Sequence, residues 1–203
     1  MRFYRSLDHV LGTRLKVAIL RTLTADSLEL NGRQIALAVG ASPKPLNQAL
    51  AQLTREGVLV QRNVGRTHLF RMNLESQLVT DLVVPLFRRE ATLLEDALRE
   101  ALAGVPGLCS AILYGSLARG EEGSFSDVDL LVVAEDEASA QAVLETRAIS
   151  FLNHYGNVLS FTVLSRAEFR RRYLERDEFV HEVARTGRVV AGQLSLELVY
   201  GSA

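Results

Sequence analysis

The chain has 203 residues, of which 48% are hydrophobic and 23% charged, with a formal net charge of −1, and this is ordinary for a soluble globular protein of one large or two small domains. No apolar run reaches the roughly 20 residues that span a bilayer, and the start lacks the apolar core of a signal peptide. The single cysteine excludes an internal disulfide or a cysteine-based zinc site, so we expect a cytoplasmic protein with no membrane partner.

The charge is unevenly distributed along the chain. Residues 1–75 hold eleven Lys or Arg and five Asp or Glu, a net +6, whereas residues 76–103 carry −2 and residues 104–203 carry −5. A basic first third suggests a polyanionic partner, and an acidic last half suits metal binding, although solvated faces can produce the same asymmetry.

The first third of the chain predicts three short helices. Apolar residues recur with helical spacing over 13–23. Asn31 is a candidate N-cap for a second helix over 32–39. Ser42, followed by a proline, predicts the start of a third helix that ends near Glu56.

A two-stranded hairpin is predicted after these helices. Residues 58–60 and 68–72 are rich in strand-forming residues, and the polar stretch 63–66 between them contains a glycine.

The order of these elements resembles a winged helix-turn-helix domain. The pattern lies in residues 34–42, 50–59, 64–66 and 70–73, and is most similar to transcription regulators of the arsenic-repressor-like kind over about residues 10–74. The resemblance implies that the third helix enters the major groove of duplex DNA and that the hairpin touches the flanking backbone. It also implies a homodimer.

The candidate DNA-binding residues follow from that resemblance. On the third helix and the hairpin they are Lys44, Asn47, Gln48, Arg55, Arg62, Arg66, Thr67, His68 and Arg71. Asn and Gln can read adenine, whereas Arg and Lys can hold phosphate or guanine. The alternative is a winged helix that is used for protein contact, because a fold does not fix a function.

Residues 76–105 are predicted to form a connecting helix. The stretch is apolar at helical spacing, and Pro85 is expected to kink or divide it. It is too apolar to stand alone in water, so we expect it to pack on the neighbouring domain or on a partner subunit. Residues 104–107, which contain glycine and proline, indicate a domain boundary.

The stretch 113–133 carries the most informative motif of the chain. Gly115 and Ser116 follow an apolar run, and Asp127 and Asp129 enter a second one. Residues two apart on a strand share a face, so this pair of carboxylates can hold a divalent cation. Gly115 allows a phosphate to approach the backbone, and Ser116 with the helix start behind it offers a hydroxyl and free N–H groups.

This segment resembles the signature of the nucleotidyltransferase superfamily of the DNA polymerase β type, in its minimal form. The matching residues are Gly115, Ser116, Ala118, Arg119, Gly120, Ser126, Asp127, Asp129 and Leu130. The resemblance implies nucleoside triphosphate binding with Mg²⁺, with Asp127 and Asp129 as catalytic metal ligands and Gly115, Ser116, Arg119 and Ser126 around the nucleotide. The alternative is a hairpin with a polar turn and merely solvated aspartates.

The remaining elements complete a small α+β domain. Strands are expected over 129–133 and 158–164, and helices over 137–155, 166–176 and 179–185. The residues that close this region, up to Gly192, look like the end of minimal nucleotidyltransferase domains, so the resemblance covers about residues 108–192.

One departure from the superfamily pattern affects the chemistry. Relatives usually carry a third carboxylate on a later strand, and the position expected for it holds Ser160, with Thr162 as the other candidate. Its loss would remove a metal ligand and the base that activates an attacking hydroxyl. Glu168 or Asp136 are candidates to replace it in space.

The predicted protein is therefore α+β, with a winged helix domain over 1–75, a connecting helix over 76–105 and a polymerase-β-type domain over 106–203. Two functions remain open. The first is a DNA-binding transcription regulator that binds Mg-nucleoside triphosphate but transfers it weakly. The second is an active nucleotidyltransferase that moves a nucleoside monophosphate to a hydroxyl of a protein, small molecule or nucleic acid.

Overall fold

The computed structural model describes residues 6–25, 29–120 and 126–200. The chain divides into two compact units, residues 1–93 and 94–203. Both helices and strands are present, so the predicted α+β class is confirmed. Within the described ranges, no helix combines the length and apolar character needed to cross a membrane.

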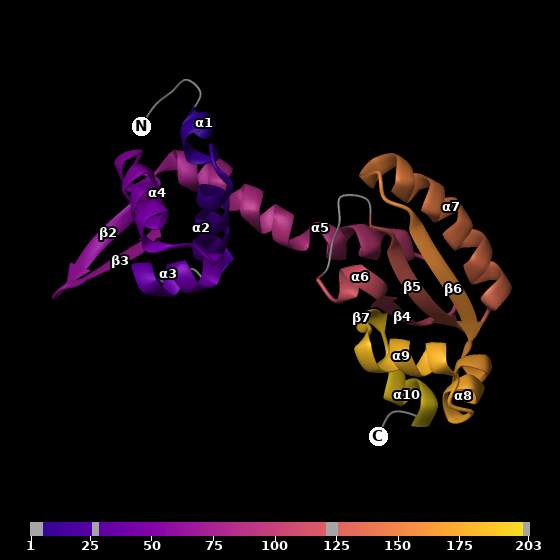
Figure 1. The fold of residues 1–203 in the computed structure, drawn as a ribbon. Helices are drawn as coiled ribbons and strands as arrows, with labels where there is room; N and C mark the ends of the chain where they lie inside the picture. Colours follow the sequence, from indigo (N-terminus) through magenta and orange to yellow (C-terminus); the bar gives the residue numbers. More distant parts are fainter. Residues whose placement is uncertain (1–5, 26–28, 121–125, 201–203) are drawn as a thin grey trace. The chain divides into compact units, whose positions relative to one another are not determined.

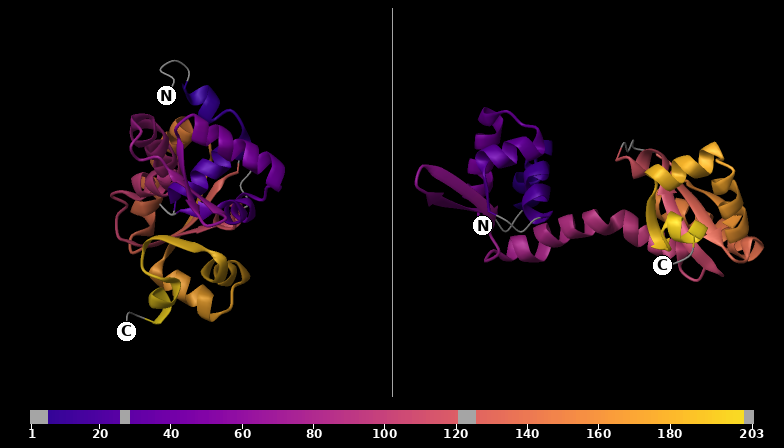
Figure 2. Two further views of the ribbon diagram at one scale, coloured as in Figure 1. Left: turned by 90° about the vertical axis from the view of Figure 1, so that its left-hand side faces the viewer. Right: turned by 90° about the horizontal axis from the view of Figure 1, so that it is seen from below.

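The first unit combines short helices with one small antiparallel sheet (Figure 1). Its elements are α1 Ser6–Val10, α2 Arg14–Ala25, β1 Leu30–Asn31, α3 Gly32–Val39, α4 Pro43–Arg55, β2 Leu59–Val64, β3 Thr67–Met72 and the π-helix η1 Val79–Val83. The sheet order is β1-β3-β2, and both strand pairs are antiparallel. The β2–β3 hairpin stands out from the helices (Figure 2). The three predicted helices and the predicted hairpin are all present.

Local signals explain where α3 begins and ends. The Asn31 side chain accepts a hydrogen bond from the Gln34 backbone N–H at 2.9 Å, and the Gln34 side chain accepts one from the Asn31 N–H at 2.9 Å. This reciprocal pair satisfies donors that a helix start leaves free. Gly40 then ends α3 in the left-handed conformation, with φ of 63°.

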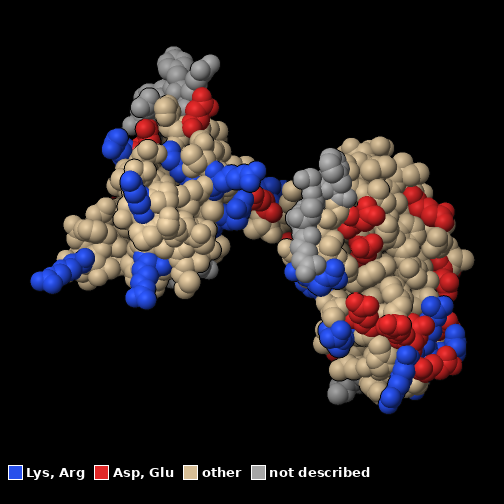
Figure 3. Space-filling model, in the orientation of Figure 1, with Lys and Arg blue, Asp and Glu red and all other residues tan. Residues whose placement is uncertain are grey.

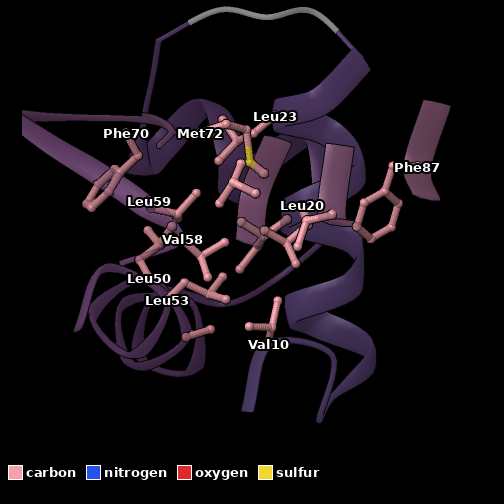
Figure 4. Close-up of a cluster of buried hydrophobic side chains, with 14 of the residues drawn as sticks. Val10, Leu20, Leu23, Leu50, Leu53, Val58, Leu59, Phe70, Met72 and Phe87 are labelled. Atoms are coloured by element: carbon pink, nitrogen blue, oxygen red, sulfur yellow. The ribbon is translucent and has the colours of Figure 1, made fainter. Parts of the chain in front are cut away.

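A single apolar core holds the first unit together (Figure 4). Leu20 of α2, Leu50 and Leu53 of α4, and Phe70 and Met72 of β3 are all buried in it. Each such side chain contributes about 1.5–3 kcal/mol by leaving water. The core therefore fixes α4 against the hairpin and leaves the opposite face of α4 in solvent.

The segment predicted as a connecting helix contains a change of helix type. The π-helix η1 runs directly into α5, which spans Val84–Leu102, and the Val84 N–H bonds to the Val79 carbonyl five residues earlier. Pro85 has no N–H to donate, so it fits in the first turn of α5. The division between the two units falls inside α5.

The second unit is a four-stranded sheet with helices on both faces (Figure 1). Besides the end of α5, its elements are β4 Leu108–Tyr114, α6 Gly115–Ala118, β5 Val128–Ala134, α7 Glu137–Tyr155, β6 Leu159–Ser165, α8 Arg166–Leu174, α9 Glu178–Thr186, β7 Arg188–Gly192 and α10 Ser195–Tyr200. The strand order is β6-β5-β4-β7. The β5–β6 pair is parallel, and the other two pairs are antiparallel.

Alternate residues of the central strand β5 serve two different cores. Leu130 and Val132 pack with α5 and α7 on one face, whereas Leu131 and Val133 pack with α8, α9 and α10 on the other. Residues an even number of positions from Leu131 in β5, which include Asp129, therefore point toward the α8–α10 side.

Two elements of the second unit were not predicted from the sequence. Strand β7 pairs with β4, and α10 packs Leu198 and Val199 against the α8–α9 face. Arg188 at the start of β7 also pairs with Glu95 of α5 at 2.7 Å. These elements close the sheet edge beside β4.

Candidate functional site

Three residues form a row across the sheet of the second unit. Tyr114 of β4 is the register partner of Asp129 of β5, and Asp129 is in turn the partner of Ser160 of β6. Paired residues on neighbouring strands project to the same face, so all three lie on the α8–α10 side. The row is the centre of the candidate site.

Gly115 is required by the Asp129 carboxylate. Its φ is +74°, a conformation that glycine adopts without strain. A Cβ atom at this position would lie 3.3 Å from the Asp129 Cγ and would crowd the carboxylate oxygen still more closely. The missing side chain therefore lets the Asp129 carboxylate lie against the backbone of Gly115.

The helix behind Gly115 is shorter than the sequence suggested. Helix α6 covers only Gly115–Ala118, one turn, before the chain reaches the C-cap Arg119. A single turn has a small dipole, because the dipole grows with the number of aligned peptide units. The free N–H groups and the half-buried Ser116 hydroxyl are what this turn can offer an anion.

Asp127 and Asp129 form a closely coupled acidic pair. Asp127 is exposed just before β5, and Asp129 is partly buried within it. Burial raises the pKa of the Asp129 carboxyl, and the negative charge of Asp127 raises it further. A divalent cation between the two groups would offset both effects.

The donor set of this pair fits Mg²⁺ that arrives with a nucleotide. Among the described residues, no group of three or more His, Cys, Asp and Glu side chains could hold a metal ion. Magnesium often binds through one or two carboxylates, with substrate phosphates and water completing its shell. Asp127 and Asp129 supply that number of carboxylates, and the Asp129 carboxylate lies against the backbone at Gly115, where the short helix α6 begins.

Tyr114 is a site residue whose role the sequence analysis missed. A side-chain hydrogen bond joins its hydroxyl to Thr162, and its ring meets Phe179 edge-on at 5.4 Å between centroids. Burial raises the pKa of the Tyr114 phenol, and Asp129 raises it further, so the phenol is neutral at pH 7. Its position directly before Gly115 and opposite Asp129 is the signal that could have identified it.

The backbone that leads into Asp127 is anchored by β6 and the turn before it. The Asn157 side-chain amide donates to the Ser126 carbonyl at 3.0 Å, and the Val128 N–H donates to the Val158 carbonyl at 2.8 Å. Asn157 therefore holds the approach to the acidic pair, and the sequence analysis did not single it out. The Arg119 side chain is exposed, and Ser126 is half-buried.

The two acids considered as replacements for the third carboxylate lie at the wrong end of the strands. Asp136 follows the end of β5 and caps α7 by accepting from the Ser139 N–H at 3.0 Å. Glu168 follows the end of β6 and pairs with Arg171 and Arg172. Five residues of β5 separate Asp129 from Ala134, about 16 Å at ~3.3 Å per residue. Neither acid can reach Asp129, and this interpretation was wrong because it ignored strand direction.

The candidate DNA-contacting residues of α4 share its exposed face. Leu46, Leu50 and Leu53 are buried, whereas Lys44, Asn47, Gln48 and Arg55 are all exposed. Lys44, Gln48 and Arg55 recur at intervals of four and seven residues, so they lie along one side of the helix. Basic side chains project from several places on the first unit, and acidic ones gather on the second (Figure 3).

The hairpin residues do not all have the same electrostatic surroundings. Glu29 pairs with Arg62, and its Oε1 lies 3.6 Å from the Arg71 Nε. Arg66, in the exposed turn between β2 and β3, has no ion pair within the described ranges. Of the three predicted hairpin arginines, Arg66 is therefore the one whose charge is not offset by a neighbouring acid.

Comparison with known proteins identifies the domain that contains the row. Residues 94–186 match the protein-family model described as "Nucleotidyltransferase domain", so the C-terminal half of the chain carries such a domain. No curated protein matches the chain. A solved structure described as "Crystal structure of the toxin-antitoxin with AMP-PNP" is similar over 52% of this chain and 80% of its own, with 16% sequence identity and a TM-score of 0.38.

Proposed function

We propose that this protein is a DNA-binding transcription regulator whose nucleotidyltransferase domain binds a nucleoside triphosphate with Mg²⁺ but transfers the nucleoside monophosphate only slowly. The observation that carries this proposal is the pairing of Asp129 with Ser160, a neutral residue, on the neighbouring strand. The first unit then acts on DNA, and the second acts as a nucleotide-responsive module.

Nucleotide binding rests on four residues around the start of α6. The backbone at Gly115 and the hydroxyl of Ser116, at the start of α6, would contact the phosphates, while Asp127 and Asp129 would hold the cation. Magnesium would neutralise phosphate charge and polarise the transferred phosphoryl group when it is bound. Arg119 and Ser126 lie on either side of this region in the sequence and are proposed to contact the nucleotide.

Slow transfer is proposed because β6 presents no carboxylate beside Asp129 among the residues that the structure describes. A base must take the proton of the attacking hydroxyl, and serine and threonine hydroxyls at Ser160 and Thr162 are far too weakly basic for this role. The Tyr114 phenol is neutral at pH 7 in any case, and burial raises its pKa further. Glu168, the nearest acid after β6, is held by two arginines at the other end of the strand.

DNA binding rests on the order of elements in the first unit. Helices α2, α3 and α4, followed by the β2–β3 hairpin, have the order of a winged helix-turn-helix domain. We propose that the exposed side of α4, with Asn47 and Gln48, reads bases. The hairpin turn with Arg66 would then hold phosphate. The net charge of +6 over residues 1–75 supports a polyanionic partner.

An active nucleotidyltransferase is the second candidate. The complete set of Gly115, Ser116, Asp127 and Asp129, together with the family match over residues 94–186, favours it. Incubation with Mg²⁺ and each nucleoside triphosphate, followed by mass spectrometry of the protein and of added acceptors, separates the two. If the protein is a regulator, we expect bound but untransferred nucleotide. Efficient transfer would instead favour the active nucleotidyltransferase.

Gel retardation with genomic fragments tests the DNA half of the proposal. The regulator predicts a sequence-preferring complex whose affinity falls steeply as salt rises, because phosphate contacts release counterions. Failure to retard any fragment at low salt would instead indicate that the first unit contacts protein.

A further inference from the structure

Asp127 is the less firmly held member of the acidic pair. Its side chain is exposed and makes no hydrogen bond or ion pair within residues 6–25, 29–120 and 126–200. Asp129, by contrast, lies within β5 and has register partners on both sides, Tyr114 and Ser160. Asp127 precedes Val128, the first residue of β5, so it lies outside the strand pairing of the sheet. The position of the Asp127 carboxylate therefore depends on how its backbone is held.

Both peptide groups that flank Asp127 are tied to the segment between α7 and β6. The carbonyl of Ser126 belongs to the peptide group before Asp127, and it accepts a hydrogen bond from the Asn157 side-chain amide at 3.0 Å. The N–H of Val128 belongs to the peptide group after Asp127, and it donates to the Val158 carbonyl at 2.8 Å. Because peptide groups are planar, fixing both of them fixes the direction in which the side chain between them projects. The two bonds together therefore set the direction of the Asp127 side chain.

Asn157 is itself held in place by the end of α7. Gly156 is the C-cap of this helix, with φ of 76°, and its N–H donates to the Leu152 carbonyl at 2.9 Å. Asn157 follows directly and is half-buried, two residues before β6 begins at Leu159. Its bond to the Ser126 carbonyl comes from a side chain, whereas the Val128 bond joins two backbone groups. A substitution of Asn157 can therefore remove one tie and leave the other in place.

We propose that Asn157 is a positioning residue for the metal-bound nucleotide. This inference rests on the proposed binding of Mg²⁺ by Asp127 and Asp129. Groups behind a metal ligand that set its orientation change metal affinity without touching the metal. Fixing the backbone of one residue costs entropy, and the Asn157 bond makes that ordering part of folding rather than of metal binding. Without this bond, Mg²⁺ would have to order Asp127, and only the metal-dependent part of nucleotide binding would weaken.

Asn157→Leu tests the proposal, because leucine has a similar size and no donor. Calorimetric titration of the full-length protein with ATP at a series of Mg²⁺ concentrations gives the Mg²⁺ concentration at which nucleotide binding is half-maximal. We expect this concentration to rise roughly fivefold to thirtyfold in Asn157→Leu, which corresponds to ordering about one residue. ATP affinity in chelator should be the same in the variant and the natural protein, because the start of α6 is unchanged.

Asn153→Leu is the matched control. Asn153 lies in the last turn of α7, is exposed and makes no hydrogen bond within the described part of the chain, so this variant should keep the natural Mg²⁺ requirement. Asn157→Ala should behave as Asn157→Leu does, which excludes an effect of leucine bulk, and thermal unfolding checks that each variant is folded.

Two results would overturn the proposal. One is an unchanged Mg²⁺ requirement in folded Asn157→Leu and Asn157→Ala. The other is an equal loss of ATP affinity with Mg²⁺ and with chelator, which would show general damage to the site. A natural protein without Mg²⁺-dependent ATP binding would instead contradict the proposed function on which the inference rests.

Discussion

Asp129 on β5 and Ser160 on β6 are direct partners in a parallel strand pair and lie on the same face of the sheet. The neighbouring strand thus presents a hydroxyl where a carboxylate would meet the acidic pair of Asp127 and Asp129. This relationship leads us to separate nucleotide binding, which we propose that the site supports, from nucleotidyl transfer, for which β6 offers no carboxylate among the described residues.

Ser160→Asp is expected to increase nucleotidyl transfer. General-base assistance is typically worth ~10²–10⁴-fold, and a grafted acid without supporting hydrogen bonds should achieve the lower part of that range or less. The measurement is transfer from labelled ATP. Ser160→Asn is the matched control, since it adds similar bulk without a base. Efficient transfer by the natural protein, with no gain in Ser160→Asp, would favour the enzyme.

Thr162→Asp should help less than Ser160→Asp. Thr162 lies two residues farther along β6, opposite Leu131, and its side chain is hydrogen-bonded to Tyr114. An acid there would disturb the phenol and lie farther from Asp129. The same transfer assay, with the two variants side by side, measures the difference, and a larger gain at Thr162 would show that the reacting groups lie farther along the strand.

Gly115→Ala is expected to abolish nucleotide binding. The methyl group would enter the space of the Asp129 carboxylate, and the left-handed backbone would be strained as well. Gly156→Ala is the matched control. Gly156 has φ of +76° but nothing lies within 4 Å of the position of its Cβ. That control should lose about 1 kcal/mol of stability from backbone strain but keep nucleotide affinity. Equal nucleotide affinity in both variants would contradict the proposed role of Gly115 in nucleotide binding.

Glu29→Gln is expected to strengthen DNA binding without changing sequence preference. It releases Arg62 and Arg71 from their ion pairs with Glu29, so both guanidinium groups become available to phosphates.

Arg66→Ala should weaken binding to all sequences alike. Asn47→Ala should cost about 1–3 kcal/mol on the preferred site only, if Asn47 reads a base. Competition gel retardation on preferred and scrambled fragments measures these effects, and a Glu29→Gln variant with weaker binding would argue against a hairpin–phosphate contact.

Much of the fold follows from signals that act over a few residues. The N-cap Asn31 and the Ser42-Pro43 start of α4 were both predicted correctly from the sequence. Gly115 and Asp129 were assigned to one motif from the sequence, and the structure brings them into direct proximity.

What the sequence did not reveal depends on distant partners. Strand β7 exists because Arg188–Gly192 pairs with β4, some 80 residues earlier, and nothing local marks it as a strand. Pairing of Arg62 with Glu29 likewise depends on tertiary packing. The interpretation of Glu168 and Asp136 was wrong for a related reason, because proximity in sequence does not tell which end of a strand carries a residue.

Glu168 makes acid sensitivity of the second unit testable. Hydrogen bonds from Arg171 and then Arg172 lower the pKa of the Glu168 carboxyl from its ordinary value of 4.5 to about 2. A carboxyl whose pKa is lower in the folded state stabilises the fold at pH values above its unfolded-state pKa. This stabilisation is lost as the pH falls through its folded-state pKa. Glu168→Gln should therefore lower the melting temperature between pH 5 and 7 relative to the natural protein, and the difference should shrink as the pH falls from about 4.5 toward 2.

The matched control for this pH dependence is Glu178→Gln. Like Glu168, Glu178 is an acid in the first turn of a helix, but it is exposed and has no ion pair within the described ranges. High salt should also reduce the effect of Glu168→Gln, because the arginine pairs are largely exposed. A difference between natural protein and Glu168→Gln that is constant with pH would contradict the assignment to these ion pairs.

The most direct test is isothermal titration of the full-length protein with each nucleoside triphosphate, with Mg²⁺ or with chelator. We expect Mg²⁺-dependent binding that is lost in the double variant Asp127→Asn/Asp129→Asn. The melting temperature of that variant should be unchanged or raised, because it removes the burial of the Asp129 charge and its repulsion by Asp127, which together raise the pKa of Asp129. Mg²⁺-dependent nucleotide binding of equal affinity in a folded double variant would contradict the central claim that this acidic pair holds the metal-bound nucleotide.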